Sequence, residues 1–305
     1  MPLLVLGGPT AVGKTALAVQ LAQYGDGEIV GADARQVYCG LNIGTGKATA
    51  EELQGVPHHL LDVVTPDQPF TVTQYAALAR AAIAGIHRRG KLPILVGGSG
   101  LYVQAVVEGL VPPEVPPQSA LREELERRWQ TDREGVLGEL ARRDPVTSDR
   151  IDRHNPRRVI RALEVMLVTG RPFSEQQRLQ PAPYQPLLLA LTAERAALHQ
   201  FADHRVAMML TGGLADEVRR LLAAGYDFHL PAFTAVGYRE MAGYLRGELS
   251  LADVRQRMQQ ATHVYQRRQL TWFRAGGRYQ WLDVEEQALA PRAWEIVRSW
   301  LGRQA

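Results

Sequence analysis

Residues 8–15 read Gly-Pro-Thr-Ala-Val-Gly-Lys-Thr, which is a complete G-x-x-x-x-G-K-S/T phosphate-binding motif. In such a loop the backbone N–H groups surround an anionic phosphate, the lysine adds a positive charge, and the final hydroxyl can bind Mg²⁺. The sequence therefore predicts phosphate binding by Gly8, Pro9, Thr10, Ala11, Val12, Gly13, Lys14 and Thr15, with Thr15 as the metal ligand. The alternative is a glycine-rich turn that binds nothing.

Two further polar residues directly follow predicted strands. Asp33 comes after the apolar run 28–32 and is suited to bind Mg²⁺ through water or to act as a general base. Ser99 lies on a glycine-rich turn after 92–96, where its hydroxyl can donate to a phosphate or a leaving group. The alternative for each is a helix cap, which Asp and Ser serve equally well.

Two clusters of arginine suggest a nucleic-acid partner. Arg157 or Arg158 shares a helical face with Arg161, which suits phosphate contacts, although a solvated basic face is the alternative. The stretch 254–282 holds six Arg and no Asp or Glu. Its aromatic and imidazole side chains suit stacking on unpaired bases, although some of them must pack in the core: His263, Tyr265, Trp272, Phe273, Tyr279 and Trp281. His58 and His59 lack further ligands for a metal and are predicted to form a structural turn that leads into a strand.

The elements that must position these residues alternate between strands and helices. Apolar runs predict strands at 3–6, 28–32, 92–96, 187–191 and 279–282, and helical patterns occur at 15–22, 73–88, 119–129 and 291–302. This alternation predicts an α/β fold with a parallel sheet flanked by helices. Ligands of such sheets bind at the carboxyl ends of the strands, where the phosphate loop, Asp33 and Ser99 should converge.

Proline-rich stretches at 112–117 and 181–186 enclose a charged helical segment in which Ser119 is a candidate cap. We therefore expect an α/β core at 1–112 and 187–305 with an all-α insertion at 113–186. The alternative is one continuous domain with proline-rich surface loops.

The composition limits the class of protein. The 305 residues are 46% hydrophobic, with a formal net charge of +3, and no apolar run reaches the ~18 to 20 residues that span a bilayer. No basic segment precedes the first apolar run, so a signal peptide is not expected. The single cysteine, Cys39, excludes an intrachain disulfide and a multi-cysteine zinc site. These features predict a cytoplasmic protein.

Taken together, the motifs resemble those of the tRNA dimethylallyltransferases (tRNA isopentenyltransferases) over essentially the whole chain. The resemblance rests on eight blocks in order: 7–15, 32–38, 42–47, 57–62, 96–102, 155–164, 235–240 and 267–274. It implies a P-loop NTPase-like core and transfer of the dimethylallyl group from its diphosphate to N6 of the adenosine 3′ to the tRNA anticodon. It implies no NTP hydrolysis. The single cysteine excludes the zinc finger of some eukaryotic members, which fits a bacterial-type enzyme.

The resemblance also implies residue roles. Asp33 matches the general base, and Ser99 matches a position that is usually Thr and lies by the departing oxygen. Lys14, Thr15 and Mg²⁺ would offset charge on the leaving diphosphate, and Arg239 matches a residue near the diphosphate and the adenine. The implied tRNA contacts are Asp33, Ala34, Arg35, Gln36, Ser99, Arg122, Arg157, Arg158, Arg161, Gly237, Tyr238, Arg239, Arg267, Arg268, Trp272 and Arg274. The expected partners are the tRNA anticodon stem-loop and dimethylallyl diphosphate, with no membrane, and the protein is expected to be a monomer.

Three alternatives fit parts of the pattern. A P-loop small-molecule kinase shares the loop but gives no reason for the acid-free basic stretch. A prenyltransferase acting on free adenine nucleotides shares the loop and Asp33 but needs neither the insertion nor Arg267 to Arg274. An RNA-binding NTPase switch would require an RNA affinity that depends on a nucleotide.

Overall fold

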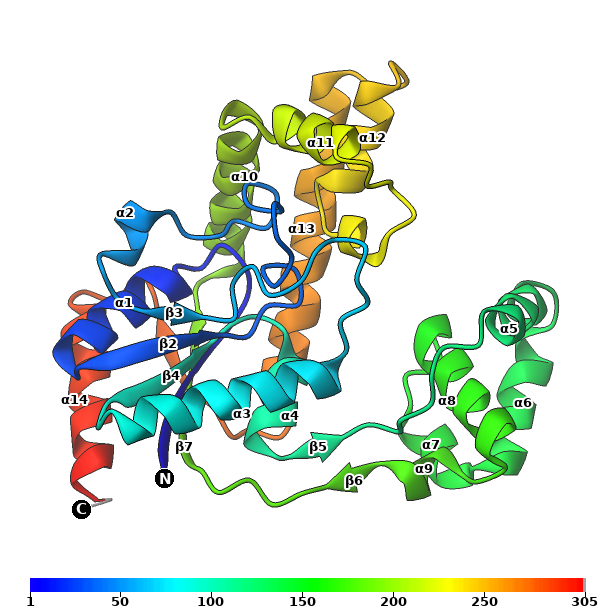
Figure 1. The fold of residues 1–305 in the computed structure, drawn as a ribbon, viewed down its shortest axis with the longest axis horizontal. Coiled ribbons are helices and arrows are strands. Elements are labelled where there is room, and N and C mark those ends of the chain that lie inside the picture. The colour runs from blue at the N-terminus through cyan, green and yellow to red at the C-terminus, as the bar shows by residue number, and fades with distance from the viewer. Residues whose placement is uncertain (304–305) are drawn as a thin grey trace. The chain divides into compact units, whose positions relative to one another are not determined.

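The computed structural model describes residues 1–303, and the chain divides into two compact units (Figure 1). One unit comprises Met1–Val107 with the chain from Pro183 onward, and the other is Glu108–Ala182. The division expected from the proline-rich stretches, at 112/113 and 186/187, falls within a few residues of these boundaries.

A parallel sheet organises the first unit, as the alternation of strands and helices predicted. Within the described residues, strands pair in the order β3-β2-β4-β1-β7-β8, and each pairing is parallel. The bounds are β1 Pro2–Gly7, β2 Gly27–Gly31, β3 His58–His59, β4 Leu92–Val96, β7 Gln185–Thr192 and β8 Gln280–Asp283. The short β3 is the two histidines themselves, at one edge of the sheet.

The two faces of the sheet bury different side chains of the same strand. On β1, Leu4 and Leu6 pack with α1 (Lys14–Tyr24) and α14 (Leu289–Gly302). Leu3 and Val5 pack with α3 (Val72–Arg88) and α4 (Gly100–Val107) on the opposite face (Figure 1). Successive side chains of the strand point to opposite faces of the sheet. Because helices cover both faces, every position in the strand is apolar.

A group of helices surrounds a second apolar core in the same unit. It consists of α10 (Arg195–Thr211), α11 (Leu214–Ala223), the 3₁₀-helix η1 (Pro231–Thr234), α12 (Tyr238–Leu245) and α13 (Leu251–Arg274). The loop after β2 joins this core through Val37, Tyr38 and Leu41, and it leads to the short helix α2 (Ala50–Leu53). The helices after β7 are thereby attached to a loop that leaves the carboxyl end of β2.

The second unit is helical and has its own core. Its helices are α5 (Ser119–Thr131), α6 (Arg133–Arg143), α7 (Pro145–Arg150), α8 (Pro156–Thr169) and α9 (Phe173–Gln176). The short strands β5 (Leu110–Val111) and β6 (Arg178–Leu179) pair where the chain enters and leaves it. Ser119, predicted as a cap, is instead the first residue of α5, because the N-cap is Gln118, whose backbone N–H donates to Glu164 at 2.7 Å.

A buried carboxylate fastens the β2 edge of the sheet. Glu28 accepts hydrogen bonds from Arg89 at 2.9 and 2.5 Å, and its Oε2 lies 2.7 Å from His59 Nε2. The hydrogen bond from Arg89 lowers the pKa of Glu28 to about 2, with His59 adding to the shift and burial opposing it. His59 therefore has a structural partner, in agreement with the prediction that the histidine pair is structural.

Replacing this carboxylate should destabilise the fold in a manner that depends on pH. Because the folded-state pKa of Glu28 lies below its ordinary value of 4.5, its stabilisation is present above that value and is lost as pH falls toward 2. We expect Glu28→Gln to lower the free energy of unfolding by about 2 kcal/mol at pH 7. Urea unfolding measures this, and the loss should shrink at pH 3.

The matched control is Glu295→Gln on the exposed side of α14 in the same unit. It should leave the unfolding curve unchanged at both pH values. An equal effect of the two variants, or a Glu28→Gln loss that is constant between pH 7 and pH 3, would contradict the assignment.

No helix within residues 1–303 is long and apolar enough to cross a membrane.

Candidate active site

The phosphate loop connects β1 to α1 in the arrangement that its motif requires. Gly8 (φ 126°) and Gly13 (φ 89°) adopt backbone conformations that favour glycine. A Cβ on Gly8 would also lie 2.7 Å from the carbonyl oxygen of Leu191, so this position has no room for a side chain. Helix α1 begins at Lys14, directly after the loop, and its unpaired N–H groups point toward the anion site that we infer there.

Lys14 folds back onto its own loop. Its Nζ donates to the carbonyl oxygen of Pro9 at 2.5 Å. Burial and, to a lesser extent, the nearby Arg205 lower the pKa of Lys14 to about 7, against the opposing effect of Asp33. The lysine is thus only partly charged near neutral pH, and a diphosphate placed beside it would raise its pKa again.

This shift predicts that anion binding takes up a proton. Lys14 is largely neutral above pH 7 in the free protein and charged in the complex, so the affinity for diphosphate should fall as pH rises above 7. Calorimetric titration with Mg²⁺-diphosphate at pH 8, in two buffers of different ionisation enthalpy, measures the uptake. We expect up to one proton more for the wild type than for Lys14→Met, because protons of the ligand itself cancel in this comparison. Equal uptake by both proteins would contradict the pKa assignment.

Arg205 of α10 is the cation beside Lys14, and the sequence analysis did not select it. Its guanidinium donates to the carbonyl oxygen of Gly46 at 2.9 Å. Burial lowers the pKa of Arg205 and Asp33 opposes this, so the guanidinium lies within the electrostatic reach of both Lys14 and Asp33. A usable signal was present in the sequence. Arg205 continues the i, i+4, i+7 spacing of the buried Leu198 and Ala202, which puts a cation on the core-facing stripe of a helix.

Arg239, predicted near the diphosphate, is exposed in the first turn of α12. Its role stays a prediction. Arg205, which shifts the pKa of Lys14, is a further candidate for contact with the diphosphate.

Asp33 follows β2 and caps the turn after it. Its Oδ1 accepts the backbone N–H groups of Arg35 at 2.8 Å and Gln36 at 3.3 Å. Capping this turn is compatible with a role as a base. Both hydrogen bonds use Oδ1 and orient the carboxylate, and neither uses Oδ2. A carboxylate held rigidly at the end of a strand is well placed for proton transfer.

Ser99 joins the turn after β4 to the turn after β2. Its Oγ accepts the backbone N–H of Ala34 at 3.0 Å, and its own backbone N–H donates to Ala32 at 3.1 Å. The side chain therefore bonds across two strands rather than capping α4. On α13, the hydroxyl of Tyr265 has a pKa raised by desolvation and by Asp33, while hydrogen bonding with Ser99 lowers it. The predicted convergence of the residues that follow β2 and β4 is thus observed.

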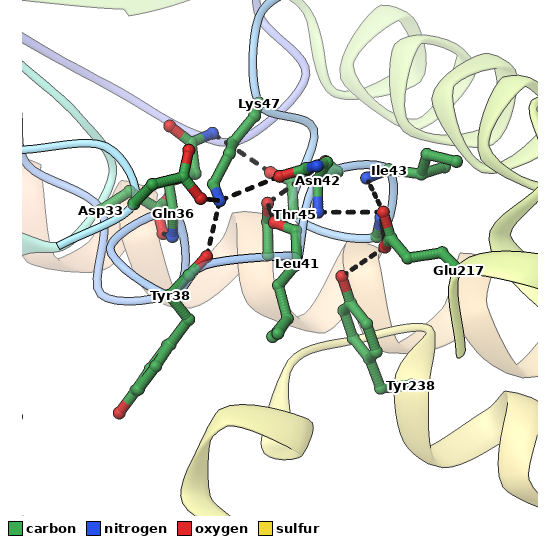
Figure 2. Close-up of polar contacts among 12 residues, drawn as sticks. Asp33, Gln36, Tyr38, Leu41, Asn42, Ile43, Thr45, Lys47, Glu217 and Tyr238 are labelled. Atoms are coloured by element: carbon green, nitrogen blue, oxygen red, sulfur yellow. Dashed lines mark hydrogen bonds and ion pairs between the residues drawn. The ribbon is translucent and has the colours of Figure 1, made fainter. Parts of the chain in front are cut away.

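Lys47 holds the loop after Asp33 by hydrogen bonds to several of its residues (Figure 2). Its Nζ donates to the carbonyl oxygen of Tyr38 at 2.6 Å, to Asn42 Oδ1 at 3.0 Å and to Asp62 Oδ1 at 2.5 Å. Gln36 donates to the carbonyl oxygens of residues 45 and 46, the latter being the acceptor that Arg205 also uses. The same loop therefore helps to fix the position of Arg205.

The buried carboxylate of Glu217 holds the tip of this loop (Figure 2). It accepts the backbone N–H groups of Asn42, Ile43 and Gly44 at 3.0, 2.7 and 3.1 Å, and the hydroxyl of Tyr238 at 2.7 Å. Tyr238 is 0% exposed and Gly237 is also buried, so both residues have a structural role in the free protein, and the tRNA contacts expected of them stay predictions.

Several predicted tRNA contacts are occupied by contacts within the protein. Arg122 and Arg161 both bond to the fully buried Glu164, at 2.7 to 2.9 Å, and Arg161 also donates to two backbone carbonyls. Arg35 donates to the carbonyl oxygen of Pro231 at 2.8 Å. Trp272 packs against Gly100 and meets Phe273 edge to face at 4.9 Å. For the three arginines, these internal bonds would compete with a phosphate.

The remaining predicted cations are exposed. Arg157 and Arg158 lie in the first turn of α8, and Arg267, Arg268 and Arg274 lie on α13. Arg274 also stands over the ring of Trp281 at 5.7 Å. Exposed guanidinium groups are the usual donors to phosphates of nucleic acids.

A small cavity lies beside the end of the phosphate loop. It is lined by Thr15, Gly31, Gln36 and His58, together with apolar side chains. His58 Nδ1 pairs with the carbonyl oxygen of Val56 at 2.9 Å, whereas its buried Nε2 has no hydrogen-bond partner among residues 1–303, and burial lowers the pKa of this histidine.

The site suits a cation that takes most of its ligands from elsewhere. Among residues 1–303, no group of three or more His, Cys, Asp or Glu side chains is placed to hold a metal ion. Thr15 is exposed in the first turn of α1 and offers one hydroxyl oxygen. Mg²⁺ commonly binds in this manner, through few protein ligands plus phosphate oxygens and water.

Comparison with known proteins gives a consistent result. A family model described as IPP transferase matches residues 36–276. A protein from Roseiflexus sp. (strain RS-1) called tRNA dimethylallyltransferase is 45% identical over 302 residues, which covers 99% of each chain. The crystal structure of a full-length tRNA isopentenylpyrophosphate transferase from Bacillus halodurans has a TM-score of 0.75 at 36% identity, covering 99% of this chain and 97% of the other.

A eukaryotic dimethylallyltransferase described as acting on tRNA is also similar. Its TM-score is 0.82 at 28% identity, covering 99% of this chain and 80% of the eukaryotic chain. The similarity therefore extends over the α/β unit, the helical unit and the helices that follow β7.

Proposed function

Because this chain belongs to the IPP transferase family, we propose that it transfers a dimethylallyl group from dimethylallyl diphosphate to tRNA. The acceptor is N6 of the adenosine on the 3′ side of the anticodon, and the products are N6-isopentenyladenosine and diphosphate. The observation that carries this proposal is the 45% identity, over 99% of both chains, to a protein called tRNA dimethylallyltransferase. The phosphate loop, Asp33 and Arg205 supply the groups that the reaction needs.

The reaction exchanges one bond for another. The lone pair of N6 forms a bond to C1 of the dimethylallyl group, and the bond from C1 to the diphosphate oxygen breaks with its electron pair on that oxygen. N6 then loses a proton, which Asp33 accepts. An exocyclic amine is a poor nucleophile because its lone pair is delocalised into the ring, so positioning and a fixed base both matter.

Negative charge develops on the diphosphate oxygen as its bond to C1 breaks. The backbone N–H groups of residues 11–15, Lys14 and Arg205 offset the charge that appears on the leaving diphosphate. In this proposal Ser99 donates its hydroxyl to the departing oxygen. Mg²⁺ held by Thr15 would add further neutralisation of the diphosphate when bound.

The tRNA would meet the exposed arginines of both units. Arg267, Arg268 and Arg274 on α13, with Arg157 and Arg158 on the helical unit, are the candidate phosphate contacts. The target adenosine must leave its stack in the anticodon loop to reach Asp33, as bases do in other enzymes that modify them. We place this activity in the cytoplasm, where tRNA is available, and propose that a monomer performs it.

Varying the acceptor tests the proposed substrate. An unmodified tRNA with adenosine 3′ to the anticodon should be prenylated, whereas the same tRNA with guanosine at that position should not. Free AMP should also fail as an acceptor. Product on AMP but not on tRNA would move the assignment to an adenine-nucleotide prenyltransferase.

A further inference from the structure

Two buried glutamines of α13 hold the phosphate loop at Thr10, one by each of the two peptide groups that flank this residue. The backbone N–H of Thr10 donates to Gln269 Oε1 at 2.8 Å, and the carbonyl oxygen of Thr10 accepts from Gln266 Nε2 at 3.0 Å. Gln266 is 2% exposed and Gln269 is 4% exposed. Because the residues are spaced i, i+3 on one helix, both amides face the loop together.

The glutamines are themselves fixed by further contacts. Gln269 Nε2 donates to the carbonyl oxygen of Gly98 at 3.0 Å, and Gln266 Nε2 donates to that of Leu198 at 2.9 Å. A Cβ on Gly98 would lie 2.0 Å from Gln269 Nε2, so the close approach of this turn to the amide requires glycine at position 98. The clamp therefore ties the phosphate loop to the turn that carries Ser99 and to the start of α10.

The phosphate loop needs such an external hold. Ala11, the residue after Thr10, has a φ of 65°, which is an unfavourable left-handed conformation for a residue with a Cβ. With Thr10 N–H bonded to Gln269, the N–H groups left for a diphosphate are those that follow it in the loop. If the hydrogen bonds to Thr10 were lost, Ala11 could return to an ordinary backbone conformation. The N–H groups that follow it would then turn away from the anion.

Packing alone does not explain the choice of Gln at position 266. Among the described residues, no donor reaches Gln266 Oε1, although this atom is buried. A buried acceptor without a partner costs about 1–3 kcal/mol, so a purely apolar role would favour an apolar side chain. The two hydrogen bonds donated by Nε2 offset this cost and explain why a glutamine occupies the position.

We propose that Gln266 and Gln269 are positioning residues for the prenyl diphosphate, acting by fixing the anion-binding conformation of the phosphate loop. This inference rests on the proposed function only in taking the loop as the diphosphate site. Neither glutamine is required to touch the substrate. The effect should therefore appear in diphosphate affinity rather than in proton transfer or tRNA affinity.

The test uses Gln266→Met and Gln269→Met, which keep the length of the side chain and remove the hydrogen bonds. The matched control is Gln260→Met, on the exposed side of the same helix. Calorimetry measures the Kd for Mg²⁺-diphosphate, and steady-state kinetics gives KM for dimethylallyl diphosphate and kcat. Filter binding gives the Kd for tRNA, and thermal unfolding reports whether each variant is folded.

We expect each clamp variant to raise the Kd for diphosphate and the KM about tenfold, with kcat and tRNA affinity within about threefold of wild type. The double variant should lose less than the product of the two single effects, because both glutamines hold the same residue, Thr10. Folded clamp variants that bind diphosphate like Gln260→Met would overturn the inference. So would a parallel loss of tRNA affinity, kcat and thermal stability, which indicates a general structural role. A wild type that binds no diphosphate would instead overturn the phosphate-site assignment itself.

Discussion

Asp33→Asn should reduce the rate of prenyl transfer by ~10² or more while tRNA affinity stays within a few-fold of wild type. The substitution is chosen because the amide oxygen of Asn can still accept the N–H groups of Arg35 and Gln36 that Oδ1 now accepts. The turn after β2 is therefore retained, and the carboxylate that accepts the proton from N6 is removed. Single-turnover kinetics with saturating tRNA and dimethylallyl diphosphate measures the chemical step directly.

Asp227→Asn is the matched control for this variant. Asp227 Oδ1 accepts the backbone N–H of His229 at 2.7 Å in the same kind of turn, on an exposed loop. We expect wild-type turnover from this control. Near-normal turnover by Asp33→Asn would remove Asp33 from the role of the base, and a loss of tRNA affinity equal to the loss in rate would make it a binding residue.

Arg205→Met should reduce kcat/KM for dimethylallyl diphosphate by ~10² to 10³, as expected for removal of a cation that faces charge developing in the transition state. A second consequence does not depend on activity. Because Arg205 helps to lower the pKa of Lys14, its removal should raise that pKa, so the proton uptake on binding diphosphate at pH 8 should decrease. The same two-buffer calorimetry measures this.

Arg239→Met decides between the arginine indicated by the resemblance and the arginine indicated by the structure. Arg239 is exposed on α12, and its replacement should leave proton uptake at the wild-type value. A greater loss of diphosphate affinity in Arg239→Met than in Arg205→Met would favour Arg239, as the resemblance implies.

Much of the α/β architecture could be predicted because its signals are local. The runs at Leu3–Leu6 and Leu92–Val96 are buried strands, and glycines at turns mark the ends where Asp33 and Ser99 lie. The phosphate loop was recognisable because its geometry requires fixed residue types at fixed spacing. The family followed from the order of several such motifs, and the comparisons confirm it.

The parts that could not be predicted depend on contacts between distant segments. The spacing of Arg205 indicates that it faces the core, but only the fold puts it beside Lys14, about 190 residues away along the chain. The resemblance implies a tRNA contact for Tyr238, and only the fold shows that its ring is buried and that its hydroxyl bonds to Glu217. In the sequence nothing indicates a partner for Arg122 or Arg161, whereas in the structure both form ion pairs with Glu164. A sequence pattern reports residue type, whereas burial and pairing decide whether a cation is available to a ligand.

The most direct test of the central claim is the mass of the nucleosides in tRNA treated with the protein. Purified protein is incubated with Mg²⁺, dimethylallyl diphosphate and unmodified tRNA, and the RNA is then digested for mass analysis. We predict one adenosine per tRNA that is heavier by one isopentenyl group, located 3′ to the anticodon, and absent when Asp33→Asn replaces the wild type. A folded wild-type protein that binds both substrates and leaves every nucleoside unmodified would contradict the account.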